Sequence, residues 1–440
     1  MTLARTFGTV SQERIAKSAS AVFDRSAIYR FCIAFALLDF MDILNVVDFT
    51  PLGTGIKYSY ALIMLGFMFL CMVRWRTVDT TTLAPVIILL FFLVTGLAFA
   101  WNFIVHDQRQ SYISAFIAPL VFSLAIFIPP NSFVVDARRI TRGLTLLFSV
   151  GCAFYLVEAI VKPLELVNNI VFLHEVQFIK SIIFVLALSL SILTGQKVLG
   201  LFLAILTITA LALRPTSTLV LALICCMPLA AMLRLRVIKV QPVAVSISRA
   251  GAMIILMLAA IIPMLLYFFF DEMGALIDLV ESYVKVDVLG GQSNTAFRLT
   301  ILKYAFASID NTSFLYGSAL AGDLNVLIAQ EHAWWLDVNK DGLVPIHSDF
   351  VIVFVLMGII GYVVFTTMFY LILKVRFREL ARRDVHDSEV VLHSLAVVAV
   401  VALVIYISGD PFLSYFNHAH VVWMLLLISE IVRKDRHTEA

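Results

Sequence analysis

Charged residues are scarce in this chain of 440 residues. Asp, Glu, Lys and Arg make up 14% of it, whereas an ordinary soluble domain has roughly 25%. Hydrophobic residues account for 61%. This composition excludes a water-soluble globular protein and predicts a chain that crosses a lipid bilayer many times.

Cysteine is also scarce, and its placement excludes two kinds of site. The five cysteines all fall inside apolar runs, so neither a disulfide framework nor a thiolate metal site is indicated. Alternating segments of about ten residues, the pattern of outer-membrane barrels, do not carry the hydrophobicity. The polar N-terminal stretch lacks the short apolar core and cleavage site of a signal peptide, so we expect a retained tail.

Long apolar runs follow one another along the chain, and each is close to the roughly 20 residues that a membrane-crossing helix needs. We therefore predict an all-α polytopic membrane protein with about twelve transmembrane helices. The runs occupy 28–47, 58–73, 83–101, 111–128, 143–161, 177–194, 198–213, 217–233, 251–270, 348–373, 389–408 and 413–432.

Lys and Arg mark the sides of the membrane. If the N-terminus is cytoplasmic, the basic clusters between runs fall on the cytoplasmic side at every turn, as the positive-inside rule requires. This topology predicts cytoplasmic tails at 1–27 and 433–440, nine helices in 28–270, an external loop at 271–347 and three helices in 348–432.

The loop 271–347, between the ninth and tenth helices, is the only predicted extramembrane piece large enough to fold. Residues 276–288 have an amphipathic pattern suited to a helix on the membrane surface. Asn294 can cap a second helix that runs to about Ile309. We therefore expect a helical external loop above one membrane domain.

Arg298 stands out because it lies in a predicted external loop, where positive-inside bias does not explain a basic residue. The loop contains ten acidic and four basic residues. Arg298 falls in the first turn of the helix that Asn294 caps, where free N–H groups already favour an anion. A guanidinium there makes a phosphate clamp. The alternative is a simple ion pair with one of the carboxylates.

Two more cations lie at predicted outer helix starts. Arg214 sits between two apolar runs with almost no loop, and Pro215 and the hydroxyl residues after it suit a helix start that binds an anion. Lys180 begins the sixth run. The alternative for both is snorkelling to lipid headgroups, which is favoured for Lys180.

His347 closes the loop and leads into the tenth run, at the predicted outer mouth of the helix bundle. Because imidazole titrates near neutral pH, it can act as a general base. The alternative is an interfacial or capping histidine. Gly358 and Gly361, further along the same run, allow close backbone packing.

Weaker candidates lie in the loop before His347. Trp334 and Trp335 can stack on sugar rings or belong to an interfacial aromatic belt. Asp337, Asn339 and Asp341 match the opening of a calcium loop, but Ser348 replaces its bidentate Glu, so we prefer a plain turn. We therefore expect neither a metal nor a cofactor.

Three histidines, His332, His418 and His420, are further outward-facing candidates. Asp39 and Asp42, in the first run, are expected to face the bundle interior or to lie near the outer boundary, and they receive no role.

Arg214, Arg298 and the segment IHSDFVIVFVLMGIIG around His347 together resemble the O-antigen ligases and the related O-antigen and exopolysaccharide polymerases of the Wzy type. That family has an arginine at an outer helix start, an arginine before a helix in its large periplasmic loop, and a histidine motif leading into a helix with Gly-x-x-Gly. The resemblance covers roughly 200–370 by motif, and it implies a glycosyltransferase of GT-C-like architecture.

The resemblance implies transfer of glycan repeat units from an undecaprenyl pyrophosphate carrier to an acceptor sugar hydroxyl in the periplasm, with inversion and without metal. Arg214, Arg298 and Lys180 would bind the pyrophosphate, and His347 would deprotonate the acceptor. It also implies the inner membrane of a bacterium as location. The expected partners are the carrier-linked oligosaccharide, an acceptor glycan, membrane lipids and a chain-length regulator and flippase of the same pathway, but no nucleic acid.

Two alternatives remain. An O-antigen ligase differs in its acceptor, a lipid core, and Ser348 stands where ligases usually have Asn, which favours a polymerase. A secondary transporter also has about twelve spans, but it should show related halves and usually a cytoplasmic connection between its sixth and seventh spans. Here that connection is a few residues around Lys197.

Overall fold

The computed structural model describes residues 51–75, 83–106, 114–128, 137–164, 181–213, 217–237, 242–269, 302, 305–306, 309, 313–317, 348–382, 385–409 and 416–436. Within these stretches the chain is almost entirely helical and contains no strand. The predicted first run, 28–47, lies outside them, as do both predicted tails apart from residues 433–436.

The helices follow the apolar runs, because each run needs a structure that satisfies its own backbone in lipid. In the part of the chain that the structure describes, five helices are long and apolar enough to cross a membrane, within Leu83–Trp101, Ser217–Val237, Val243–Phe268, Asp349–Ala381 and Asp387–Gly409. The protein is thus built as a multi-pass membrane protein. The helices are α4 (Pro51–Trp75), α5 (Leu83–His106), α6 (Ser114–Ile117), α7 (Leu120–Ser123), the 3-10 turn η1 (Leu124–Ile126), α8 (Ala137–Leu164), α10 (Ile182–Thr194), α11 (Lys197–Leu213), α12 (Ser217–Val237), α13 (Pro242–Phe268), α16 (Ser313–Tyr316), α19 (Asp349–Ala381), α20 (Asp387–Gly409) and α21 (Phe416–Arg436).

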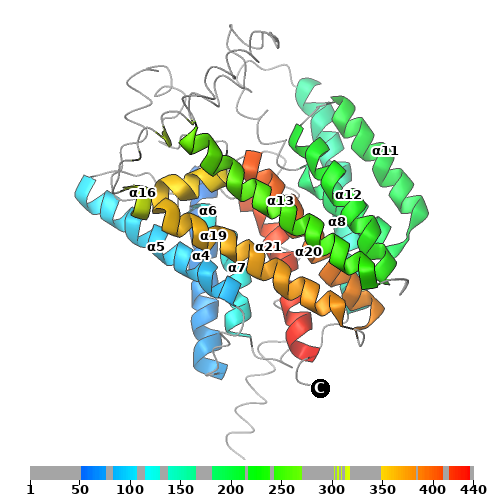
Figure 1. The fold of residues 1–440 in the computed structure, drawn as a ribbon, viewed down its shortest axis with the longest axis horizontal. Helices are drawn as coiled ribbons and strands as arrows, with labels where there is room; N and C mark the ends of the chain where they lie inside the picture. Colours follow the sequence, from blue (N-terminus) through cyan, green and yellow to red (C-terminus); the bar gives the residue numbers. More distant parts are fainter. Residues whose placement is uncertain are drawn as a thin grey trace, which may run out of the picture.

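Helix α20 forms the centre of the bundle. Its apolar stretch is entirely buried inside the protein, whereas α13 buries 17% of its own. Figure 1 shows α4 to α7 on one side of the molecule and α8, α11 and α12 on the other, with α13 and α19 crossing in front. Large apolar side chains on the outer helices, such as Leu201 and Ile254, are exposed, as a lipid-facing surface requires.

The predicted span 111–128 differs from a single helix. It is divided into α6, α7 and η1, and Phe116 to Ile128 are all buried. Pro119 explains the break, because proline has no N–H to donate to the preceding turn and it disfavours helical backbone in the residue before it.

The predicted span 348–373 differs more strongly. Gly358 has φ 63° and ψ −168°, a conformation open essentially to glycine alone, so α19 consists of a short arm, 349–357, and a long arm, 359–381. The rings of Phe350 and Phe369 lie 6.3 Å apart, although nineteen residues of straight helix would separate them by about 28 Å. The short arm therefore folds back on the long arm.

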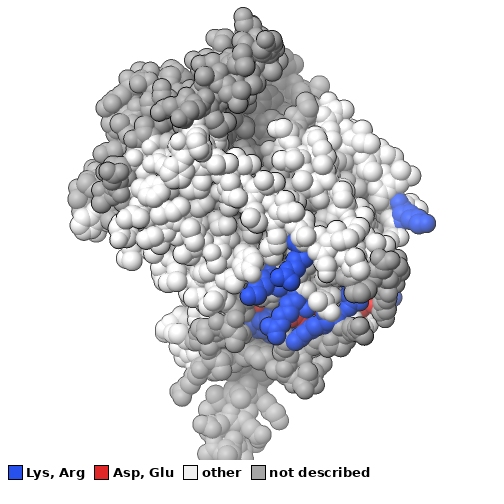
Figure 2. All heavy atoms as spheres, in the orientation of Figure 1, with Lys and Arg blue, Asp and Glu red and all other residues white. Residues whose placement is uncertain are grey.

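Basic side chains gather at one end of the bundle, which we call the basic end, formed by the ends of α10, α12, α19 and α21 (Figure 2). There the Arg234 guanidinium donates to the carbonyl of Leu193, and the Arg236 guanidinium donates to the carbonyl of Leu380 at 2.9 Å. These bonds hold together the helix ends that the charge pattern predicts to share one side of the membrane.

Candidate functional site

The opposite end of the bundle brings together the starts of α10, α12 and α19 around the last turn of α20. Ser181 directly precedes α10, and its hydroxyl lies 2.5 Å from the hydroxyl of Tyr406 in α20. Both side chains are fully buried. This hydrogen bond attaches the start of α10 to the end of α20.

Ser348 attaches the start of α19 to the same turn. Its hydroxyl lies 3.4 Å from the carbonyl oxygen of Ile407, and it caps the short arm by accepting from the backbone N–H of Val351 at 3.4 Å. Ser348 and Asp349 are 4% and 1% exposed. The beginning of α19 is thus buried. The predicted place of His347 at the outer mouth of the bundle stays a prediction, because His347 lies outside the described residues.

The start of α12 completes the arrangement. A side-chain carbon at Gly409, the last residue of α20, would lie 3.6 Å from the hydroxyl oxygen of Thr218. We call Ser181, Thr218, Ser348 and Tyr406 the hydroxyl junction. Ser181, Ser348 and Tyr406 are buried and their hydroxyl groups are bonded within the protein, so the junction ties the starts of α10 and α19 to the end of α20.

Three of the predicted site residues adjoin the junction in sequence. Lys180 precedes Ser181, His347 precedes Ser348, and Arg214 lies four residues before Thr218. All three lie outside the described residues, and so do the other predicted site residues, Arg298, Trp334, Trp335, Asp337, Asn339 and Asp341. The structure therefore brings together their described neighbours and does not test the side chains themselves.

Part of the predicted external loop packs into the bundle. Leu302, Ala305 and Phe306 are helical, in the stretch predicted as a helix capped by Asn294. The ring of Phe306 lies 5.4 Å from the ring of Tyr267 at the end of α13. The loop is thus anchored to the membrane helices by aromatic contacts.

His420, predicted as an outward-facing candidate, is 1% exposed. Its Nε2 atom lies 2.7 Å from the hydroxyl of Tyr60, which joins α21 to α4. This position fits a structural histidine better than an accessible one. Asp39, Asp42, His332 and the side chain of His418 lie outside the described part of the chain.

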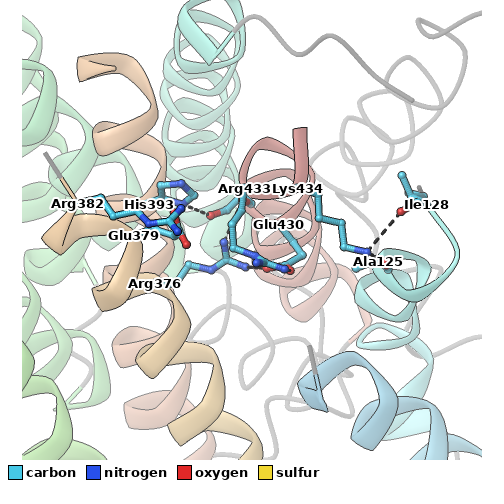
Figure 3. Close-up of polar contacts among 10 residues, drawn as sticks. Ala125, Ile128, Arg376, Glu379, Arg382, His393, Glu430, Arg433 and Lys434 are labelled. Carbon is cyan, nitrogen blue, oxygen red and sulfur yellow. Dashed lines mark hydrogen bonds and ion pairs between the residues drawn. The ribbon is translucent and has the colours of Figure 1, made fainter. Parts of the chain in front are cut away.

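A second polar cluster, which sequence reasoning missed, lies at the basic end (Figure 3). Arg376 of α19 forms an ion pair with Glu430 of α21, and their side chains are 1% and 0% exposed. Arg433 also pairs with Glu430, at 2.6 Å. We call Arg376, Glu430 and Arg433 the buried ion triad. Its signal in the sequence is weak, because Arg376 and Arg433 both belong to basic stretches that topology alone explains.

Hydrogen bonds extend the triad to the neighbouring elements. Nδ1 of His393 in α20 lies 2.9 Å from the hydroxyl of Ser429, and Arg376 donates to the carbonyl of Ser429 at 2.9 Å. The ammonium of Lys434 lies 2.5 Å from the carbonyl oxygen of Ala125 in η1. The cluster joins α19, α20, α21 and η1 at one level, so its evident role is to hold these elements together.

Among the described residues, no group of three or more His, Cys, Asp or Glu side chains is placed to hold a metal ion. Comparison of the chain with protein-family models and with curated proteins found no match.

Proposed function

We propose that this protein is a polysaccharide polymerase that transfers glycan repeat units from an undecaprenyl pyrophosphate carrier to an acceptor sugar hydroxyl. One observation carries the proposal. Ser181 and Ser348, which follow Lys180 and His347 directly, bond to Tyr406 and Ile407 in one turn of α20. Thr218, four residues after Arg214, lies near Gly409 in the same turn. Two cations and a base drawn from distant parts of the chain are what transfer from a pyrophosphate requires.

In the proposed reaction the acceptor hydroxyl oxygen attacks the anomeric carbon from the face opposite the carrier. The bond between that carbon and the pyrophosphate oxygen breaks, and the pyrophosphate leaves with the electron pair. Arg214 and Arg298, with Lys180, stabilise the charge that it gains. His347 takes the hydroxyl proton, and the anomeric centre is inverted.

The charge distribution supports a periplasmic site in the inner membrane of a bacterium, with both termini cytoplasmic. Arg234, Arg236 and Arg376 lie at the basic end, opposite the hydroxyl junction. Since basic residues are retained in the cytoplasm, the junction would face the periplasm. There it would meet carrier-linked glycan delivered by a flippase, and a chain-length regulator would act on the product.

Gene deletion followed by gel analysis of surface glycans tests this function. We expect single repeat units without long chains, and restoration of long chains by the parent gene. Carrier-linked long polymer that never reaches its lipid core would instead identify a ligase, and unchanged glycans would refute both.

Point variants test the assigned residues in the same strain. Variants His347→Ala and Arg298→Ala, shown to be inserted at parent levels, should fail to restore long chains. His386→Ala is the matched control, because His386 is exposed at the other end of the bundle and its ring hydrogen-bonds to Ser388, two residues away. Full chain production by His347→Ala would refute the proposed base.

A further inference from the structure

Two glycines with positive φ cross backbone to backbone beside the short arm of α19. Gly317, directly after α16, has φ 83°, and Gly358, at the bend of α19, has φ 63°. A side-chain carbon at Gly317 would overlap the backbone of Leu356 and Met357, and one at Gly358 would overlap the backbone of Leu315 and Tyr316. The absence of a side chain at each glycine therefore leaves the space that the backbone of the other segment occupies.

Aromatic contacts hold this crossing from three elements. The ring of Phe354 in the short arm lies 5.9 Å from that of Phe314 in α16 and 5.2 Å from that of Tyr267 in α13. On its other side the short arm contacts the long arm, where the ring of Phe350 lies 5.5 Å from that of Phe365. The short arm thus packs against α16, α13 and the long arm of α19.

The short arm is consequently fixed at both ends. Gly358 fixes its C-terminal end at the crossing, and Ser348 fixes its N-terminal end at the carbonyl of Ile407. The nine residues 349–357 form one continuous helical segment about 13 Å long. This segment joins the crossing directly to Ser348.

We propose that the crossing of Gly317 and Gly358 is a positioning device that sets the place of the start of α19. This proposal rests on the proposed function. It makes both glycines positioning residues for the proposed base, His347, which directly precedes Ser348. It also connects the external loop, through α16, to that base. An added methyl group at either glycine displaces the short arm without touching a reacting atom.

Water accessibility at position 348 tests the positioning without reference to activity. Ser348→Cys is made in a chain whose native cysteines are replaced by alanine, and its labelling by a water-soluble maleimide is timed. We expect slow labelling, because Ser348 is 4% exposed. Gly317→Ala and Gly358→Ala should each raise the rate at least about tenfold. The replaced cysteines are Cys32, Cys71, Cys152, Cys225 and Cys226.

Gly251→Ala is the matched control, because a side-chain carbon there meets nothing within 4 Å. It should leave the labelling rate at the parent value. Labelling at the parent rate in folded Gly317→Ala and Gly358→Ala would overturn the proposal. If either variant fails to fold, Phe314→Leu loosens the crossing without an overlapping atom, and its labelling rate decides in the same way.

Glycan transfer by purified protein provides the second readout. The two glycine variants should lower kcat about 100-fold while KM for the carrier-linked donor stays near the parent value. Unchanged kcat would overturn the positioning role. A parent protein that transfers no glycan would refute the proposed function, while the labelling rates would still decide whether the crossing positions Ser348.

Discussion

Phe350 packs against Phe369 of its own helix, with the ring centroids 6.3 Å apart. The contact exists because α19 reverses at Gly358 and lays its first residues beside the middle of its long arm. Ser348, at the start of the short arm, is therefore buried beside the last turn of α20.

Phe350→Ala should lower the free energy of unfolding by about 3–5 kcal/mol, because it removes a fully buried ring and leaves a cavity between the two arms. Titration with denaturant of the protein in detergent or bilayers measures the change in the free energy of unfolding. Phe202→Ala serves as the control, since Phe202 is 51% exposed, and its effect should stay within about 0.5 kcal/mol. Equal effects of the two substitutions would contradict the folded-back arm.

Glu430→Ala should cost about 3–5 kcal/mol of stability, because it leaves Arg376 buried without its carboxylate partner. Thermal unfolding of the purified protein measures this loss. Arg378→Ala is the matched comparison, because Arg378 is an exposed arginine near the end of the same helix as Arg376, so its removal should cost about 0.5 kcal/mol or less. A Glu430→Ala protein as stable as the parent would show that the buried ion triad does not hold the basic end together.

A double-mutant cycle tests the hydroxyl junction. Tyr406→Phe and Ser181→Ala each remove one partner of the 2.5 Å hydrogen bond between α20 and α10. We expect a coupling free energy of about 1 kcal/mol between the two substitutions. Additive effects, measured by equilibrium unfolding, would mean that the two hydroxyl groups do not interact.

Metal removal should leave glycan transfer unchanged, because the proposed reaction uses cationic side chains and a histidine base. Transfer is measured before and after treatment with EDTA and EGTA. In parallel, titration with Ca²⁺ should give neither binding nor a thermal shift if Asp337, Asn339 and Asp341 form a plain turn. Loss of transfer on chelation, restored by added calcium, would contradict both expectations.

Hydropathy was sufficient to predict most of the helices. The runs 83–101 and 389–408 correspond to α5 (Leu83–His106) and α20 (Asp387–Gly409), because a helix in lipid must extend as far as its apolar residues do. The charge pattern predicted that the ends of α12 and α19 share one side of the membrane, and the bond from Arg236 to the carbonyl of Leu380 joins these two ends.

The bend of α19 was beyond hydropathy, because the residues on both sides of Gly358 are equally apolar and every one of 350–357 is buried. Only the Gly-x-x-Gly pair hinted at close packing, and it does not encode a reversal. The pairing of Arg376 with Glu430 was hidden for another reason. The two residues are 54 positions apart, and each lies near a helix end where positive-inside bias already accounts for basic side chains.

The sequence was sufficient to predict which residue types belong to the candidate site, but not how their segments pack together. Sequence reasoning named Lys180, Arg214 and His347 but gave no reason for their segments to meet at Tyr406 and Ile407. That meeting depends on the packing of α20 at the centre of the bundle, which arises from tertiary contacts among four helices and leaves no periodic trace in any one of them.

Glycan transfer by the purified protein in a defined bilayer is the decisive experiment for the proposed polymerase. The donor is a repeat unit linked to undecaprenyl pyrophosphate. The length of the glycan chains formed and the amount of carrier released are measured. The parent and His386→Ala should both form long chains, whereas His347→Ala should be at least about 100-fold slower. A parent protein that forms no chains, or a His347→Ala variant as fast as the parent, would contradict the account.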